Sequence, residues 1–249
     1  MKRIVNAILT ATMTFVLFGC GVTKEKEKIY IGISPDYPPF ESKNIDGEII
    51  GFDFEMSKWI AEKLKSDGYI VEWKEMDFDT ITSSVQEDKI DLGISGFTYD
   101  EQRAKQVSYS DAYYGSALVC VVPKGSDITK LSDLTGKTIV VQTGSTCEKV
   151  ANEMKATDDT ITIESVEDIN AFMQSSKAKK MDACFLNEAD AKEYKDFKIL
   201  KEEVKTLEEN TYYAIGNKDN KELMEALNKV IEEFKKSEDY KTFTEKWGL

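Results

Sequence analysis

Short apolar runs alternate along the chain with segments whose apolar residues recur at every third or fourth position. The short runs predict strands, whereas the longer period places apolar side chains on one face of a helix. Strands that alternate with helices are typical of α/β folds, in which helices cover the faces of a mostly parallel sheet. The predicted strands are residues 29–33, 70–73, 90–94, 117–122, 138–141, 161–164, 183–186 and 211–215.

Helical periodicity fills most of the intervals between these strands. The first helix is predicted to begin at Asp53, whose carboxylate we expect to cap the helix N-terminus, and to end at Lys65. Another helix begins at Gly144, Ser145 and Thr146, directly after strand 138–141. The other predicted helices are residues 80–86, a segment after Gly96, residues 168–174, residues 223–234 and a short final helix that ends at Trp247.

The N-terminus has the pattern of an export signal. Lys2 and Arg3 precede an apolar stretch, residues 4–18, which is shorter than the ~20 residues that a membrane-spanning helix needs. We therefore predict that residues 1–19 are a signal peptide and take no part in the fold.

The end of this signal resembles a bacterial lipobox. Residues 17–20 read Leu-Phe-Gly-Cys, so the resemblance makes this a lipoprotein signal peptide and Cys20 the lipidated residue. In residues 20–28, Lys alternates with Glu over positions 24–28 and apolar anchors are lacking, which predicts a tether that does not fold. The expected location is extracytoplasmic, with the chain held by lipid to the outer face of the cell membrane. A secreted protein without lipid is the alternative.

The strand and helix pattern restarts after Pro123 and Gly125, which indicates a second α/β unit inserted into the first. The predicted organisation is a first lobe of residues 29–117 and 212–249 and an inserted second lobe of residues 118–211. The chain would then cross between the lobes twice, near residues 117–122 and 210–215. Because ligands of α/β sheets bind outside the carboxyl ends of the strands, one cleft between the lobes is the expected site.

The composition excludes several functions. The net charge is −13, and it becomes −15 without Lys2 and Arg3 of the signal, which argues against nucleic acid as a partner. The sequence has no histidine, so catalytic triads that use histidine are excluded and the commonest metal ligand is missing. We predict neither a metal nor a cofactor.

Three cysteines follow Cys20, namely Cys120, Cys147 and Cys184, and their spacing matches no zinc pattern. An odd number allows at most one disulfide. A bond between Cys147 and Cys184 and three buried reduced thiols are both open.

The segment from Gly96 to Arg103 has the chemistry of a small-anion site. It follows an apolar strand, and its glycine allows backbone groups to approach a ligand closely. Thr98 adds a hydroxyl group and Arg103 a planar guanidinium that matches a carboxylate bidentately. An ordinary strand-to-helix turn, with Arg103 exposed, is the alternative on composition alone.

The chain carries a series of short motifs at residues 38–40, 51–53, 91–103, 108–110, 113–114, 134–137, 144–146, 182–183 and 245–248. With these motifs in this order, the mature chain resembles the polar amino-acid solute-binding proteins of ABC transporters, from Ile29 to Trp247. The resemblance implies the two-lobed periplasmic-binding-protein fold of type II, with the two chain crossings as its hinge. It also implies a monomer without enzymatic activity that delivers a small carboxylate-bearing solute, an amino acid above all, to a membrane permease.

The resemblance also implies roles for ten residues. From the first lobe, Arg103 would bind the ligand carboxylate, and from the second lobe Thr146 would meet it at a helix N-terminus, where free N–H groups favour an anion. The others would contact the carboxylate, the ammonium group or the side chain of the ligand; these are Ser95, Gly96, Thr98, Gln142, Tyr37, Phe78, Ser34 and Asn187.

Asn187 departs from the family pattern, which has an aspartate there to pair with the ligand ammonium. A buried cation without a counter-charge is costly. Glu188 or another carboxylate, from Asp77, Asp79 or Asp36, would have to supply the charge, or the ligand is not an ordinary α-amino acid.

Two other functions remain open on the sequence. A dehydratase like the cyclohexadienyl dehydratases shares this fold and would need an acid such as Glu188 or Asp79 in the cleft. A sensor that passes its ligand state to a receptor would have the same binding residues.

Overall fold

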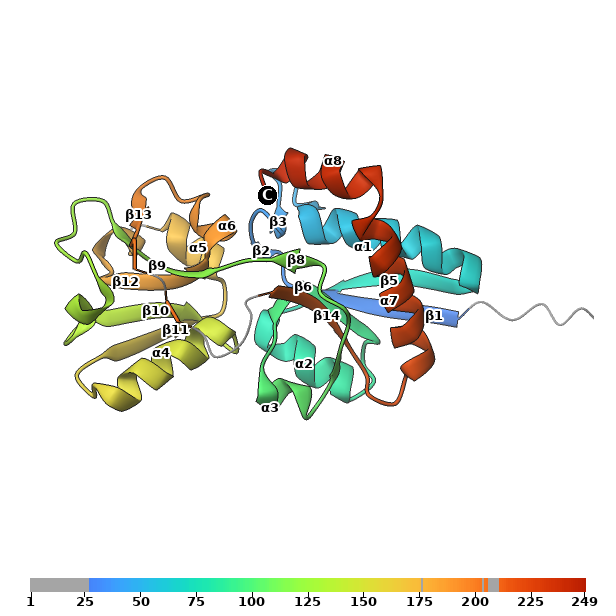
Figure 1. The fold of residues 1–249 in the computed structure, drawn as a ribbon, viewed down its shortest axis with the longest axis horizontal. Coiled ribbons are helices and arrows are strands. Elements are labelled where there is room, and N and C mark those ends of the chain that lie inside the picture. Colours follow the sequence, from blue (N-terminus) through green and yellow to red (C-terminus); the bar gives the residue numbers. More distant parts are fainter. Residues whose placement is uncertain (1–26, 176, 203, 206–210) are drawn as a thin grey trace, which may run out of the picture.

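Two β-sheets organise the protein, each with helices on both faces (Figure 1). The computed structural model describes residues 27–175, 177–202, 204–205 and 211–249. The predicted signal peptide, the lipidation residue Cys20 and tether residues 20–26 lie outside the described residues.

The first lobe is built on the sheet with strand order β5-β1-β6-β14-β7, and β8 pairs with β14. Helices α1, α7 and α8 lie on one side of this sheet, and α2 and α3 lie on the other (Figure 1). A small sheet, β2-β3-β4, adjoins it. The elements are β1 (Glu27–Ile33), β2 (Asp36–Tyr37), β3 (Glu41–Lys43), β4 (Ile49–Ile50), α1 (Phe52–Leu64), β5 (Tyr69–Glu75), α2 (Phe78–Gln86), β6 (Leu92–Thr98), α3 (Glu101–Ala104), β7 (Ser108–Tyr109), β8 (Tyr114–Gly115), β14 (Thr211–Gly216), α7 (Lys221–Lys235) and α8 (Glu238–Trp247).

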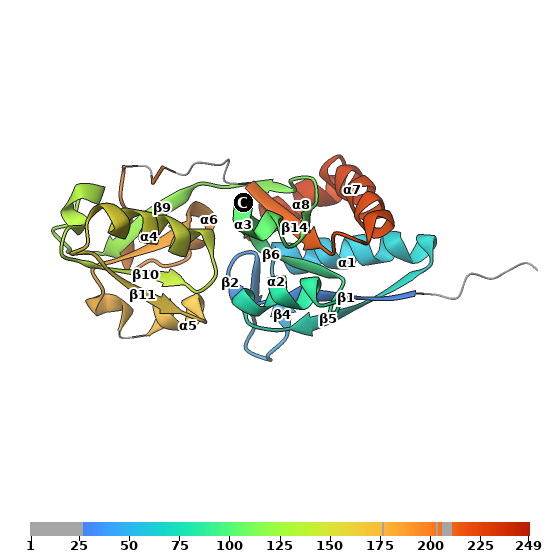
Figure 2. The same ribbon diagram turned by 90° about the horizontal axis from the view of Figure 1, so that it is seen from below.

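The second lobe is built on the sheet with strand order β11-β10-β12-β9-β13. Figure 2 shows its helices α4 and α5 on opposite sides of β10 and β11. The elements are β9 (Leu118–Pro123), β10 (Thr138–Gln142), α4 (Thr146–Thr157), β11 (Thr162–Val166), α5 (Ile169–Gln174), β12 (Ala183–Asn187), α6 (Glu188–Ala191) and β13 (Phe197–Ile199). The predicted strands and helices all appear, with bounds shifted by a few residues.

Both sheets are mixed rather than mostly parallel. Strands β1, β5 and β6 run parallel, as do β10, β11 and β12, but β14 and β9 run antiparallel to their neighbours. The reason is that β9 and β14 are the first strands after each chain crossing. They start at the edge that faces the other lobe, where the parallel strands end: Thr98 pairs with Tyr212, and Asn187 with Leu118. One end of the predicted return crossing, Asn210, lies outside the described residues.

The first helix begins differently from the prediction. The N-cap of α1 is Gly51, with φ 127°, and Asp53 lies inside the first turn. A Cβ atom at Gly51 would collide with the backbone of Phe40, so only glycine fits this close approach. The Asp53 carboxylate is therefore free to turn inward, where it accepts hydrogen bonds from Gly96 and Tyr113.

An aromatic cluster supports the first lobe beside the cleft. The ring of Phe40 contacts Tyr212 edge-on, with centroids 4.7 Å apart, and Phe52 and Tyr113 lie within the same cluster. All four side chains are fully buried. Aromatic pairs in this geometry add to the stability from burial, so this wall of the cleft is firmly held.

Candidate functional site

A pocket lies where the carboxyl ends of the parallel strands of both lobes meet. Eight of the ten predicted site residues line it: Tyr37, Phe78, Ser95, Gly96, Thr98, Gln142, Thr146 and Asn187. Glu41, Ser145, Cys147, Phe185 and Leu186 complete the lining. Residues far apart in the sequence thus converge on the cleft, as expected for ligand sites at strand ends.

Polar groups of the two lobes bond directly across this cleft. The hydroxyl oxygens of Thr98 and Thr146 lie 2.6 Å apart, and the backbone N–H of Asn187 donates to the Tyr37 hydroxyl at 2.9 Å. Thr146 is the first residue of α4, whose N-cap is Ser145. The structure therefore shows a closed arrangement, with the N-terminus of α4 against the end of β6.

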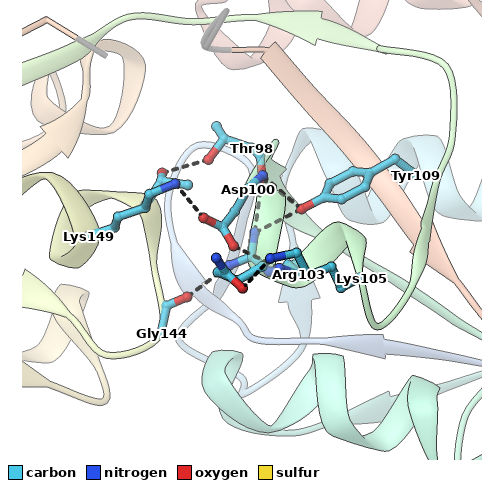
Figure 3. Close-up of polar contacts among 9 residues, drawn as sticks. Thr98, Asp100, Arg103, Lys105, Tyr109, Gly144 and Lys149 are labelled. Carbon is cyan, nitrogen blue, oxygen red and sulfur yellow. Dashed lines mark hydrogen bonds and ion pairs between the residues drawn. The ribbon is translucent and has the colours of Figure 1, made fainter. Parts of the chain in front are cut away.

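Arg103 lies beside the pocket, at the rim of the cleft (Figure 3). Its guanidinium donates to the carbonyl oxygen of Thr98 at 2.9 Å, to the Tyr109 hydroxyl at 3.3 Å and, across the cleft, to the carbonyl oxygen of Gly144 at 2.8 Å. The ring of Phe97 lies 5.1 Å from the guanidinium carbon. The side chain is buried, and these three acceptors carry no charge. The guanidinium thus keeps a positive charge that an anionic ligand can neutralise.

An ion pair crosses the same rim. Lys149 of α4 donates to Asp100 at 2.7 Å, and Asp100 caps α3 by accepting from the backbone N–H of Arg103 (Figure 3). Partial burial opposes the ionised form of Asp100, but the hydrogen bonds from Lys149 and Arg103 outweigh it and lower the pKa of this carboxyl. Both charges therefore persist at neutral pH.

Two aromatic rings flank the pocket, as the resemblance implies. Tyr37 stacks on Phe40 with ring centroids 6.4 Å apart, and Phe78 stacks on Phe97 at 4.7 Å. Each is 8% exposed. Each ring is thus held from behind by a second ring, with little freedom to turn.

Ser34 and Gln142 meet at a buried carboxylate that extends the site. The Ser34 hydroxyl donates to Asp36 at 2.9 Å, and the Gln142 amide donates to the other oxygen of Asp36 at 2.6 Å from the opposite lobe. Burial raises the pKa of Asp36 to about 7. Ser34 lines an adjoining acidic pocket rather than the central one; its other acidic residues are Glu75, Asp77, Glu167 and Asp168.

Four acids named from the sequence could supply the charge missing at Asn187, and they differ in how close they lie to the cleft and how deeply they are buried. The Glu188 side chain is 46% exposed and pairs with Lys192 at 2.9 Å, and Asp77 and Asp79 are exposed. Only Asp36 of that group is buried at the cleft. Glu188 and Asp79 are thus poorly placed for the acid that a dehydratase needs.

Glu41 is the site residue that sequence reasoning missed. It follows Pro38, Pro39 and Phe40 in a segment that reads as a loop, and an acidic residue in a loop is normally exposed. In the structure it is fully buried, and its Oε1 accepts from the Ser95 hydroxyl at 2.8 Å. Burial, together with the neighbouring Asp53, raises the pKa of Glu41 well above its usual range.

The three cysteines of the fold are free and buried, so the open question of a Cys147–Cys184 bond is answered by three thiols. Burial raises the pKa values of Cys120 and Cys147 to about 12. The thiols therefore stay protonated and unreactive at neutral pH. Among the described residues, no group of three or more acidic or cysteine side chains is placed to hold a metal ion.

Comparison with known proteins decides the family. The sequence model of the bacterial extracellular solute-binding proteins, family 3, matches residues 29–249. The chain belongs to this family. The arginine-binding extracellular protein ArtP of Bacillus subtilis (strain 168) is 32% identical to this solute-binding protein over 259 residues, which cover 99% of this chain and 98% of the relative. The ABC transporter arginine-binding protein 1 of Escherichia coli (strain K12) is 30% identical over 253 residues, which cover 99% of both.

Solved structures confirm the fold class of this solute-binding protein. An ancestral arginine-binding protein bound to arginine is 36% identical, with a TM-score of 0.79 over 88% of this chain and 97% of the other. The predicted two-lobed type II fold and the predicted family are thus confirmed. No helix in the described part of the chain has the length and apolar character needed to cross a membrane.

Proposed function

We propose that this protein captures an amino acid with a cationic side chain between its lobes and delivers it to an amino-acid ABC transporter. The observation that carries the proposal is the buried guanidinium of Arg103, which reaches both lobes and donates hydrogen bonds to neutral oxygens of Thr98, Tyr109 and Gly144. A carboxylate at the Thr98 and Thr146 hydroxyls would lie between this charge and the N-terminus of α4, which both favour an anion.

The acidic surroundings of the cleft support a cationic side chain. Asp36 lies at the junction between the central pocket and the adjoining acidic pocket, held by Ser34 and Gln142. Tyr37 and Phe78 line the central pocket, and aromatic faces attract cations such as a guanidinium. L-Arginine is the first ligand to test, because both curated relatives described above are named arginine-binding proteins.

Closure of the lobes provides the binding mechanism. We take residues 29–117 and 212–249 as one moving body and residues 118–211 as the other. A ligand that contacts both bodies favours the closed state by its differential affinity. A shift from 1:99 to 99:1 requires about 5.5 kcal/mol, which a few charge-assisted hydrogen bonds can supply.

The location follows from the N-terminus. We propose that the chain is exported, cleaved before Cys20 and lipidated there, so that residues 20–28 tether the lobes to the outer face of the membrane near the permease. Anchoring by lipid keeps the captured solute close to the transporter. The protein would act as a monomer.

The test compares Arg103→Ala with the charge-preserving Arg103→Lys by thermal shift against L-arginine and the other amino acids. The wild type should be stabilised by L-arginine, Arg103→Ala should lose this stabilisation, and Arg103→Lys should keep only part of it because lysine cannot bind a carboxylate bidentately. Equal stabilisation of wild type and Arg103→Ala would overturn the site, and a wild type that responds to no amino acid would overturn the function.

A further inference from the structure

Two buried carboxyl groups lie together beside Ser95 and Gly96, near the end of strand β6. Glu41 of β3 and Asp53 of α1 are both fully buried, and their carboxyl groups contact each other. Glu41 Oε2 and Asp53 Oδ1 have no other hydrogen-bond partner among the described residues. Two ionised carboxylates in contact would repel each other strongly, so the pair holds one proton and carries one negative charge.

Hydrogen bonds connect this pair to the cleft. The Ser95 hydroxyl donates to Glu41 Oε1 at 2.8 Å, and Ser95 Oγ accepts from the backbone N–H of Ser34 at 3.1 Å. Asp53 Oδ2 accepts from the backbone N–H of Gly96 at 2.8 Å and from the Tyr113 hydroxyl. The Glu41–Asp53 pair therefore fixes Ser95 and Gly96 by hydrogen bonds and places its negative charge directly behind these two residues.

Glu41 is the only ionisable acid among the residues that line the central pocket in the described part of the chain. The second-lobe lining is neutral, since it consists of Gln142, Ser145, Thr146, Cys147, Phe185, Leu186 and Asn187. A ligand ammonium that enters this pocket loses its water and needs a negative charge nearby. The neutral second lobe cannot supply that charge.

We propose that the Glu41–Asp53 pair supplies the negative charge for the α-ammonium group of the ligand. The inference rests on the proposed function, because it takes the ligand to be an α-amino acid. It assigns the ammonium to the first lobe, at the pair behind Ser95 and Gly96, whereas the carboxylate lies between Arg103 and the N-terminus of α4. The pair would attract an ammonium before the lobes close.

The test uses isosteric variants that separate charge from hydrogen bonding. Glu41→Gln keeps an acceptor for the Ser95 hydroxyl and a donor toward Asp53, so one charge stays on Asp53. Asp53→Asn likewise keeps the acceptor for Gly96 and Tyr113 and leaves the charge on Glu41. Only the double variant Glu41→Gln/Asp53→Asn removes the negative charge of the pair.

Calorimetry with two probes gives the readout: L-arginine, and 5-guanidinopentanoic acid, which is arginine without the α-amino group. The wild type and both single variants should prefer L-arginine by about tenfold or more, the size of a charge-assisted hydrogen bond. The double variant should bind both probes with similar affinity, while its affinity for 5-guanidinopentanoic acid stays at the wild-type value. Asp190→Asn, which replaces a buried carboxyl group outside the pocket lining with an isosteric amide, should keep the wild-type preference.

Three results would overturn the inference. These are a double variant that keeps the preference, a loss of preference in Asp190→Asn, and single variants that lose it as fully as the double variant. If the wild type binds neither probe nor any other amino acid, the proposed function fails as well, so the two failures are distinguishable.

If the double variant does not fold, a measurement on the wild type tests the same inference. A cation beside the pair favours its singly ionised form, so near pH 6, where burial places the pKa of Asp53, L-arginine should release more protons on binding than 5-guanidinopentanoic acid does. Binding heats in two buffers of different ionisation enthalpy measure this difference. Equal proton release would contradict the inference.

Discussion

The two faces of the cleft are built from different chemistry. The first-lobe face carries the charges: Arg103 at its rim, and Asp36 and Glu41 buried at or beside the pocket. The pocket residues of the second-lobe face are neutral and gather at the N-terminus of α4 and the end of β12. Charged groups of the second lobe lie outside the central pocket: Lys149 pairs with Asp100 across the rim, and Glu167 and Asp168 line the adjoining acidic pocket.

This difference between the two faces indicates that the first lobe recognises the charged groups of the ligand, whereas contacts from the second lobe favour closure. Glu41 and Asp53 are held by bonds within the first lobe, from the Ser95 hydroxyl and the Gly96 N–H, so these two acids are in place before the lobes meet. The second lobe contributes hydroxyl, amide and helix-terminus contacts that form only on closing. Binding energy from the second lobe therefore appears as a preference for the closed state.

The largest expected effect is on the pH dependence of stability, and it comes from the buried carboxyl groups of the first lobe. Burial raises the pKa of Asp36 to about 7 from 3.8, so between pH 4 and 7 the folded protein holds a proton that the unfolded chain has released. The free energy of unfolding should thus fall as pH rises through this window, by up to about 1.4 kcal/mol per pH unit from this group. Urea unfolding at several pH values measures the slope.

Asp36→Asn removes this titration and should flatten the slope without abolishing it, because the pKa of Asp53 is also raised, to about 6, by burial. Parallel curves for wild type and variant would show that Asp36 does not hold its proton in the folded protein.

The second effect tests whether the second lobe acts through closure. Gly144, with φ 74°, faces the first lobe, and a Cβ atom there would lie 2.9 Å from Cβ and 3.1 Å from Cα of Asp79. Gly144→Ala should hinder closing and weaken ligand binding by about tenfold or more, in line with a cost of ~1–3 kcal/mol for overpacking.

Gly136→Ala is the matched control. Gly136 has a similar φ of 71°, and its Cβ would meet no atom within 4 Å. Both variants therefore bear the same backbone strain, and only Gly144→Ala obstructs the cleft. Equal affinities for L-arginine in the two variants, by calorimetry, would refute closure onto Asp79.

The smallest effect concerns the ion pair across the rim. The Lys149 side chain is 40% exposed, and pairs of this kind contribute up to about 1 kcal/mol. Lys149→Ala should therefore weaken ligand binding by no more than about fivefold, and high salt should reduce the difference from wild type. Lys155→Ala, in the last turn of the same helix, serves as the control. An effect that persists unchanged in 1 M salt would rule out a screened ion pair.

Much of the fold could be predicted because its elements are locally encoded. The apolar face of Met56, Ile60 and Leu64 predicts α1 whatever the rest of the chain does, and each α/β unit shows its own alternation. Strand direction could not be predicted from local patterns. Strands β9 and β14 run antiparallel because they start at the chain crossings, and this is a property of the whole topology.

In the candidate site, too, some residues could be predicted from the sequence and others could not. Thr98 and Arg103 stand in one continuous motif, so their chemistry could be inferred from neighbouring residues, and the family resemblance added Thr146. The burial of Glu41 could not be inferred, because it depends on contacts with Ser95 and Asp53, residues 54 and 12 positions away. The burial of Asp53 could not be inferred for the same reason. The sequence predicts Asp53 as the N-cap of the first helix, but in the structure the N-cap is Gly51.

The sequence by itself determined the family and the α/β class, and it predicted a carboxylate site in the segment from Gly96 to Arg103, because each depends on residue types at short or fixed spacing. Only the tertiary structure decided which acids stand at the pocket. It buries Glu41 and Asp36 and leaves Glu188 exposed beside Lys192. The physical reason is that a carboxylate acquires its protonation state and its role from burial and neighbours, and both are set when distant strands and helices pack together.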